Sequence, residues 1–108
     1  MTYTVIATER AAREIEDAAA WWAENRSVEQ AERWYQGIRA AIAALAVSPE
    51  ARPVAAENDS FPYEIRELHY GLSSKSTHRV IFTIVRQTVL VLTVRHAARR
   101  PLTPDDLA

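Results

Sequence analysis

The chain has 108 residues, of which 48% are hydrophobic and 25% charged, so it fits one globular domain over residues 1–108. It contains no cysteine, which excludes disulfides, zinc–thiolate sites and cysteine nucleophiles. No apolar run approaches the roughly 18 residues that span a membrane, and the first residues lack the pattern of a signal peptide, so we expect a cytoplasmic protein. The net charge of −1 divides into −4 over residues 1–60 and +5 over residues 61–100, which makes the later half basic.

The first half of the chain predicts one short strand and two helices. Residues 3–7 are of β type, and Thr8 is a suitable N-cap for a helix that runs to about Ala23, with apolar residues at three- and four-residue steps. Ser27 opens a capping box for a second helix, which Ser48-Pro49 ends. The few residues between the helices predict an antiparallel hairpin.

Three strands are expected in the second half, after an irregular connection over residues 49–62 that is rich in Pro, Asn, Asp and Ser. The strands are predicted over Tyr63–Leu68, His78–Val85 and Val89–His96, with a loop at His69–Thr77. The fold class is therefore α+β in the order β-α-α-β-β-β, with the helical hairpin packed on a mostly antiparallel four-stranded sheet.

Alternation along these strands divides their side chains between the two faces of the sheet. The face expected to pack under the helices contains Tyr63, Ile65, Val80, Phe82, Ile84, Leu90, Leu92 and Val94. The opposite face, expected to be open, contains Glu64, Arg66, Arg79, Ile81, Thr83, Val89, Val91, Thr93 and Arg95. We interpret this face, with Arg66, Arg79 and the following Arg99, as a surface that binds a polyanion or an acidic partner, because guanidinium groups hold phosphates and carboxylates in a bidentate manner.

The histidines and glycines give no cofactor signal. His96 falls on the apolar face, where a structural role is favoured over catalysis, and His69 and His78 flank the predicted loop, where solvated histidines are usual. The histidine spacing matches no metal motif, and Gly37 and Gly71 offer no phosphate-binding loop. We therefore expect no metal and no cofactor.

The adjacent tryptophans of the first helix indicate an exposed aromatic group. Trp21 and Trp22 lie about 100° apart around the helix axis, so both cannot point into one core. One of them is expected to be half exposed, and an exposed indole beside Tyr35 of the second helix would suit a partner helix.

The order of elements and three late motifs resemble the RelE/ParE superfamily of toxins from type II toxin–antitoxin (plasmid stabilisation) systems. The motifs are Pro62-Tyr63-Glu64-Ile65-Arg66, His78-Arg79-Val80-Ile81-Phe82 and Val94-Arg95-His96-Ala97-Ala98-Arg99. The resemblance covers nearly the whole chain and implies growth inhibition that a cognate antitoxin, encoded alongside, neutralises. Under this interpretation Trp21, Trp22 and Tyr35 are the candidate antitoxin-binding residues.

Two branches of that superfamily imply different targets. The RelE branch cleaves messenger RNA on the ribosome, which would make Arg66, Arg79, Arg99 and His96 the catalytic candidates. The ParE branch poisons DNA gyrase without a catalytic centre, which would make Arg66, Arg79, Arg95 and Arg99 target-binding residues.

Two departures from the RelE pattern favour a gyrase inhibitor. Glu64 stands where RelE-like nucleases carry a second basic residue, and the tail over residues 102–107 contains no tyrosine. A ribosome-dependent endoribonuclease and a non-toxic relic that only binds antitoxin remain the alternatives. The sequence therefore leaves open whether the protein is an enzyme, and it does not identify the antitoxin or the stoichiometry.

Overall fold

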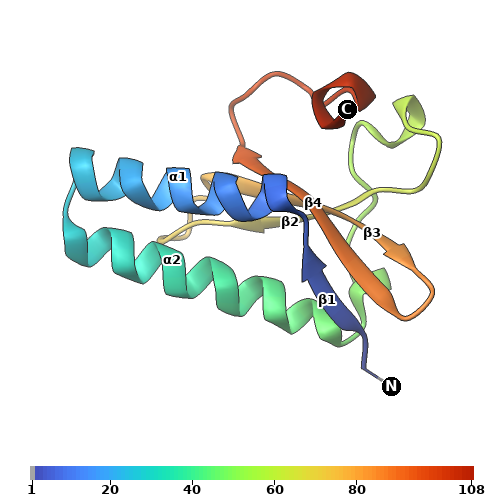
Figure 1. The fold of residues 1–108 in the computed structure, drawn as a ribbon, viewed down its shortest axis with the longest axis horizontal. Helices are drawn as coiled ribbons and strands as arrows, with labels where there is room; N and C mark the ends of the chain where they lie inside the picture. Colours follow the sequence, from blue (N-terminus) through green and yellow to red (C-terminus); the bar gives the residue numbers. More distant parts are fainter. Residues whose placement is uncertain (1) are drawn as a thin grey trace.

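The fold is taken from a computed structural model, which describes residues 2–108, and it consists of two helices packed on a four-stranded sheet (Figure 1). The helices and strands are β1 (Thr4–Ala7), α1 (Glu9–Asn25), α2 (Val28–Ala43), β2 (Arg66–Tyr70), β3 (His78–Val85) and β4 (Thr88–His96). Short 3₁₀ turns follow at Ala44–Ala46, Pro49–Ala51, Asn58–Ser60 and Pro104–Leu107. This order confirms the predicted β-α-α-β-β-β arrangement. Within residues 2–108, no helix is long and apolar enough to cross a membrane.

Local side chains start both helices, as predicted. The Thr8 hydroxyl accepts a hydrogen bond from the amide of Ala11 at 3.1 Å, and the Ser27 hydroxyl accepts one from the amide of Gln30 at 3.0 Å. Each bond satisfies an amide of the first turn that has no partner within its own helix.

The sheet has the strand order β1-β4-β3-β2. β1 pairs with β4 in parallel, and the other two pairs are antiparallel. The mostly antiparallel sheet is thus confirmed, and α1 and α2 cover one of its faces. The core under the helices, called here the helix-side core, contains Ala11, Ile15, Trp34, Ile38, Ile42, Leu45, Leu68, Val80, Phe82, Val89, Val91 and Val94.

A β-bulge in β4 changes which of its residues face the helices. Ile81 pairs with Thr93 but Phe82 pairs with Val91, so Leu92 is an extra residue. The prediction that Val89 and Val91 lie on the open face is therefore wrong, because both are fully buried, at 0% exposure, in the helix-side core. The prediction that Leu90 and Leu92 face the helices is also wrong: Leu92 packs against the opposite side of the sheet, and Leu90 pairs with Thr83 on that side.

The second strand begins later than the sequence predicts, at Arg66 instead of Tyr63. The residues before it bond to the connection: the amide of Ile65 donates to the Asn58 side chain at 2.8 Å, and its carbonyl accepts from the amide of Ala55 at 2.9 Å. Tyr63 and Ile65 are therefore not part of the helix-side core, and Leu68, which pairs with Val80, is.

The sheet face opposite the helices is covered by a second core, which contains Ala55, Phe61, Ile65, Ile81 and Leu102 with Leu92 and Leu107 packed against it. These residues come from the sheet, from the connection over residues 49–62 with the following Ile65, and from the C-terminal segment, residues 101–107. The 3₁₀ turn at Asn58–Ser60 and that of the C-terminal segment lie near each other in Figure 1, and the amide of Leu102 donates to Glu57. The predicted open face is thus largely covered.

Candidate functional site

The four arginines predicted to bind a target do not share one open surface. Arg79 and Arg95 are directly opposite each other on β3 and β4, but they are only 9% and 4% exposed. Arg66 is half-buried at the sheet edge, opposite Phe82, and Arg99 is exposed beyond β4. The prediction of an open basic face is therefore wrong, because alternation identifies a face of a strand but not the segments that cover it.

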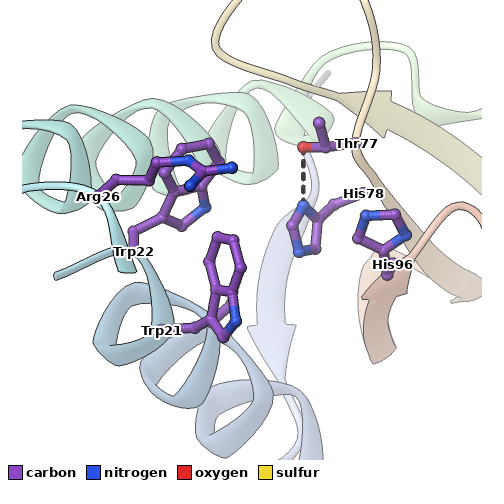
Figure 2. Close-up of a pocket in the computed structure, with 7 residues that line it drawn as sticks. Trp21, Trp22, Arg26, Thr77, His78 and His96 are labelled. Atoms are coloured by element: carbon purple, nitrogen blue, oxygen red, sulfur yellow. Dashed lines mark hydrogen bonds between the residues drawn. The ribbon is translucent and has the colours of Figure 1, made fainter. Parts of the chain in front are cut away.

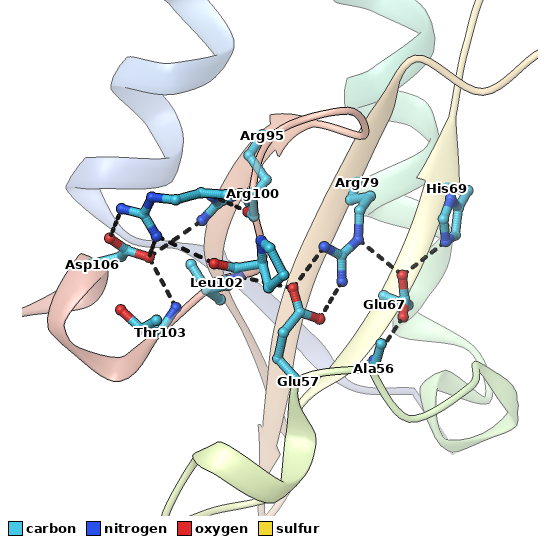
Figure 3. A network of polar contacts seen from close by, with 11 residues as sticks. Ala56, Glu57, Glu67, His69, Arg79, Arg95, Arg100, Leu102, Thr103 and Asp106 are labelled. Carbon is cyan, nitrogen blue, oxygen red and sulfur yellow. Dashed lines mark hydrogen bonds and ion pairs between the residues drawn. The ribbon is translucent and has the colours of Figure 1, made fainter.

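The Arg79 guanidinium is fully engaged by two carboxylates (Figure 3). Its two terminal nitrogens donate to Glu57 at 2.8 and 2.6 Å, and its Nε donates to Glu67 at 3.0 Å. These bonds raise the pKa of Arg79 above its ordinary value and, from the other side, lower the pKa of Glu57 from 4.5 to about 2. The charge of Arg79 is therefore compensated inside the protein.

The same two glutamates connect separate parts of the chain. Glu57 also accepts a hydrogen bond from the amide of Leu102 at 2.9 Å. Glu67 accepts one from the amide of Ala56 at 3.2 Å, and its other oxygen lies 2.8 Å from Nε2 of His69. The connection, β2, β3 and the C-terminal segment are thus joined through Arg79 and its partners, as Figure 3 shows.

Arg95 is less well satisfied than Arg79. One terminal nitrogen donates to the carbonyl of Arg100 at 2.8 Å, and the other lies 3.7 Å from Asp106. Its Nε is buried and has no hydrogen-bond partner in the part of the chain described. Burial and the neighbouring Arg99 lower the pKa of Arg95. Asp106 makes its shortest contact with Arg100, at 2.7 Å.

Arg66 makes its contacts locally. It pairs with Glu64 at 3.0 Å and donates to the carbonyl of Arg52 at 2.6 Å. Glu64 itself is exposed. Glu64, which the sequence predicts on the same face of the strand as Arg66, is thus its ion-pair partner.

A pocket of about 360 Å³ lies between the C-terminal half of α1 and the ends of β3 and β4 (Figure 2). Its walls are formed by Ala18, Trp21, Trp22, Arg26, Thr77, His78 and His96. The two tryptophan rings meet edge to face with centroids 5.6 Å apart, and the Arg26 guanidinium lies 5.6 Å from the Trp21 ring. Trp21 is 48% exposed, which confirms that one of the pair is half exposed.

The strand side of this pocket is made by a cross-strand pair of histidines. His78 and His96 are directly opposite each other, with ring centroids 5.4 Å apart, and His78 also lies 4.9 Å from the Trp34 ring. Burial, with a smaller effect of His96, lowers the pKa of His78 to about 4, so this imidazole is neutral near pH 7. His78 is therefore not a solvated loop residue. His96 lies on the helix side of the sheet, as predicted, but it is exposed.

The pocket includes two of the three predicted antitoxin-binding residues. Tyr35 lies elsewhere: it packs partly against the helix-side core, with the Arg39 guanidinium 5.3 Å from its ring. Sequence reasoning missed the contributions of Arg26 and of the two histidines. If the pairing of β3 and β4 continued without a bulge from the Arg86-Gln87 turn, His78 would lie opposite Arg95. The bulge shifts the register by one residue and places His78 opposite His96.

A metal site requires at least three ligand side chains close together. Over residues 2–108, no group of three or more His, Cys, Asp or Glu side chains is placed to hold a metal ion.

Comparison with known proteins identifies a family for the chain and solved structures with the same fold. The family model described as the ParE toxin of the type II toxin–antitoxin system parDE matches residues 5–101. A chain from the solved chromosomal ParDE toxin–antitoxin system of P. aeruginosa superposes with a TM-score of 0.72. The two chains share 14% sequence identity, and the match covers 88% of this chain and 96% of that one, so it shows the fold. No curated protein matches this sequence.

Proposed function

The chain belongs to the ParE toxin family of type II toxin–antitoxin systems, and from this membership we propose that it inhibits growth by binding DNA gyrase and cuts no RNA. A cognate antitoxin is its partner in such a system. We assign target contact to the exposed Arg99 and antitoxin contact to the tryptophan pocket.

The pairing of Arg79 is the observation that supports a non-catalytic toxin. A nuclease must present free cationic groups to the charge that develops on the scissile phosphate. All three nitrogen positions of Arg79 donate to carboxylates instead, and Arg66 is paired with Glu64. The glutamates at these positions would also repel a phosphate. Of the four candidates for RNA cleavage, only His96 and Arg99 are exposed.

A supercoiling assay with purified gyrase tests the target. We expect the purified toxin to inhibit supercoiling and to leave messenger RNA on programmed ribosomes intact. Arg99→Ala should weaken the inhibition, because Arg99 is the one exposed residue among the four predicted target-binding arginines. Arg13→Ala, which removes an exposed arginine from α1, is the matched control and should inhibit like the wild type. Ribosome-dependent cutting that disappears in His96→Ala or Arg99→Ala would establish the nuclease alternative.

The tryptophan pocket supports an antitoxin-binding role for Trp21 and Trp22. Its wall combines the exposed indole of Trp21, the Arg26 guanidinium beside that ring and the neutral imidazole of His78. An apolar side chain of the antitoxin could pack on the indole, and a following acidic group could pair with Arg26. Tyr35 stays a predicted contact on the neighbouring helix. We expect Trp21→Ala to weaken antitoxin binding about 10- to 100-fold, a loss typical of a central aromatic contact.

A matched control separates binding from folding in this experiment. Val47→Ala also truncates an exposed apolar side chain, but Val47 follows α2 at the opposite end of the helical hairpin from the pocket (Figure 1). It should bind antitoxin like the wild type in isothermal titration. If Trp21→Ala and Val47→Ala bound equally well, the pocket would not be the antitoxin site.

A further inference from the structure

Two like charges face each other on the side of the sheet opposite the helices. Arg79 and Arg95 are cross-strand partners on β3 and β4, and both are buried. Like charges directly opposite in a sheet destabilise it unless other groups compensate them. Arg79 has this compensation from Glu57 and Glu67 at 2.6 to 3.0 Å.

Arg95 lacks equivalent compensation. The one carboxylate near it, Asp106, is 3.7 Å from its terminal nitrogen, which is too long for a hydrogen bond. The Nε of Arg95 has no partner among the described residues, although its side chain is only 2% exposed. A desolvated guanidinium with an unused donor is unfavourable. Arg95 is therefore an anion site that the folded chain fills only in part.

The C-terminal segment lies over this site in the manner of a docked peptide. Leu102 is buried and Leu107 partly buried against the second core, so the segment is anchored by an apolar side chain at each end. Between them, Thr103 and Asp106 form a capping box, which orients the Asp106 carboxylate toward Arg95 and Arg100 (Figure 3). An acidic group between two leucines is thus the chemistry that this surface holds.

We propose that Arg95, together with Arg100, forms a carboxylate-binding site that the C-terminal segment occupies in cis, and that an acidic, leucine-bearing segment of a partner protein binds there by displacing it. A partner carboxylate that reaches the free Nε of Arg95 makes a bidentate contact that Asp106 does not make. These contacts lie within the chain and do not depend on which target the toxin inhibits.

The surroundings favour a peptide over a nucleic acid as the displacing ligand. Glu57 and Glu67 lie at the neighbouring Arg79 and would repel a string of phosphates. The contacts of Leu102 and Leu107 with the second core require apolar side chains, which a phosphate backbone does not supply. An acidic peptide satisfies both conditions.

The ion pair that holds the C-terminal segment in cis is accessible to a competing carboxylate. The shortest ion pair joins Arg100 to Asp106 through two hydrogen bonds of 2.7 and 3.0 Å, and the Arg100 side chain is 58% exposed, so a competing carboxylate can reach it. The segment still has the advantage of a linked ligand, whose effective concentration is on the order of millimolar. A free peptide should therefore bind the wild-type protein poorly and bind well once the Asp106 contact is removed.

Fluorescence anisotropy with a labelled peptide of residues 101–108 tests the site on full-length protein. We expect Asp106→Ala to bind this peptide at least about tenfold more tightly than the wild type, as loss of a cis competitor requires. Adding Arg95→Gln should abolish the gain, whereas adding Arg13→Ala, an exposed arginine of α1, should leave it unchanged. A peptide with asparagine in place of its second aspartate should bind about tenfold more weakly.

Three results would overturn the proposal: equal affinity of the wild type and Asp106→Ala, a gain that survives Arg95→Gln, or displacement of the peptide by a single-stranded oligonucleotide at lower concentration than by unlabelled peptide. Should Asp106→Ala fail to fold, hydrogen exchange in the wild type provides the test. Millimolar peptide should speed exchange of the Leu102 amide, which donates to Glu57 when the C-terminal segment occupies the site. The asparagine peptide should not, and equal effects of both peptides would count against the site.

Discussion

Replacing Glu57 by glutamine should destabilise the protein, because Glu57 is the carboxylate that joins Arg79 to the C-terminal segment. Its two oxygens accept two bonds from Arg79 and one from the amide of Leu102, and its side chain is only 7% exposed. The pKa of Glu57 falls from 4.5 to about 2. At about 1.4 kcal/mol per pKa unit, this shift corresponds to roughly 3 kcal/mol of folding free energy. Glutamine keeps the shape but loses the charge, so we expect Glu57→Gln to cost about 2–3 kcal/mol at pH 7.

The stability lost in Glu57→Gln should depend on pH. A carboxyl whose pKa is lowered in the folded state stabilises the protein fully above its unfolded pKa, and this contribution is lost as the pH falls through the folded pKa. For Glu57 the loss should run from about pH 5 down to about pH 2. The stability difference between wild type and Glu57→Gln should therefore shrink over that range.

Urea unfolding at several pH values between 7 and 2 measures that difference directly. A control variant, Glu64→Gln, removes an exposed carboxylate that pairs with Arg66 and should change stability by under about 1 kcal/mol. If Glu57→Gln were as stable as Glu64→Gln, or if its deficit did not change with pH, the Arg79 pairing would not have the energetic role described here.

Three further results are expected. A Cβ on Gly37 would lie 1.8 Å from the Tyr70 hydroxyl, so Gly37→Ala should lose about 1–2 kcal/mol in urea unfolding despite its better helix propensity, and adding Tyr70→Phe should recover part of the loss. In an NMR titration His78 should gain its proton near pH 4, and a midpoint near 6.5 would show that its ring is solvated. Phe82→Ala should cost about 3–5 kcal/mol, since Phe82 is fully buried, and a cost under about 1 kcal/mol would place it outside the core.

Local features of the fold could be predicted because the interactions that produce them act over a few residues. The Thr8 and Ser27 caps each bond an amide three residues ahead, which a sequence shows directly. Trp21 and Trp22 diverge because of helix geometry alone, and the structure has one of them half exposed as a result.

The sites depended on two features that have no local signal. The first is the bulge in β4, which adds Leu92 and shifts the register by one residue. Without it, the turn between β3 and β4 would place Arg79 opposite Val94 instead of Arg95, and His78 would not meet His96. A bulge is chosen by the packing of both faces of a sheet, so counting along one strand cannot reveal it.

The second feature is the cover over the basic face. Alternation shows from the sequence which residues within one strand share a face, but only the bulge brings Arg79 and Arg95 to the same side of the sheet. Tertiary contacts place Glu57 and the C-terminal segment over these two arginines. Both segments are irregular, so they have no periodic pattern of apolar residues from which their position could be predicted. Their position is set by apolar contacts and ion pairs with residues far away in the chain.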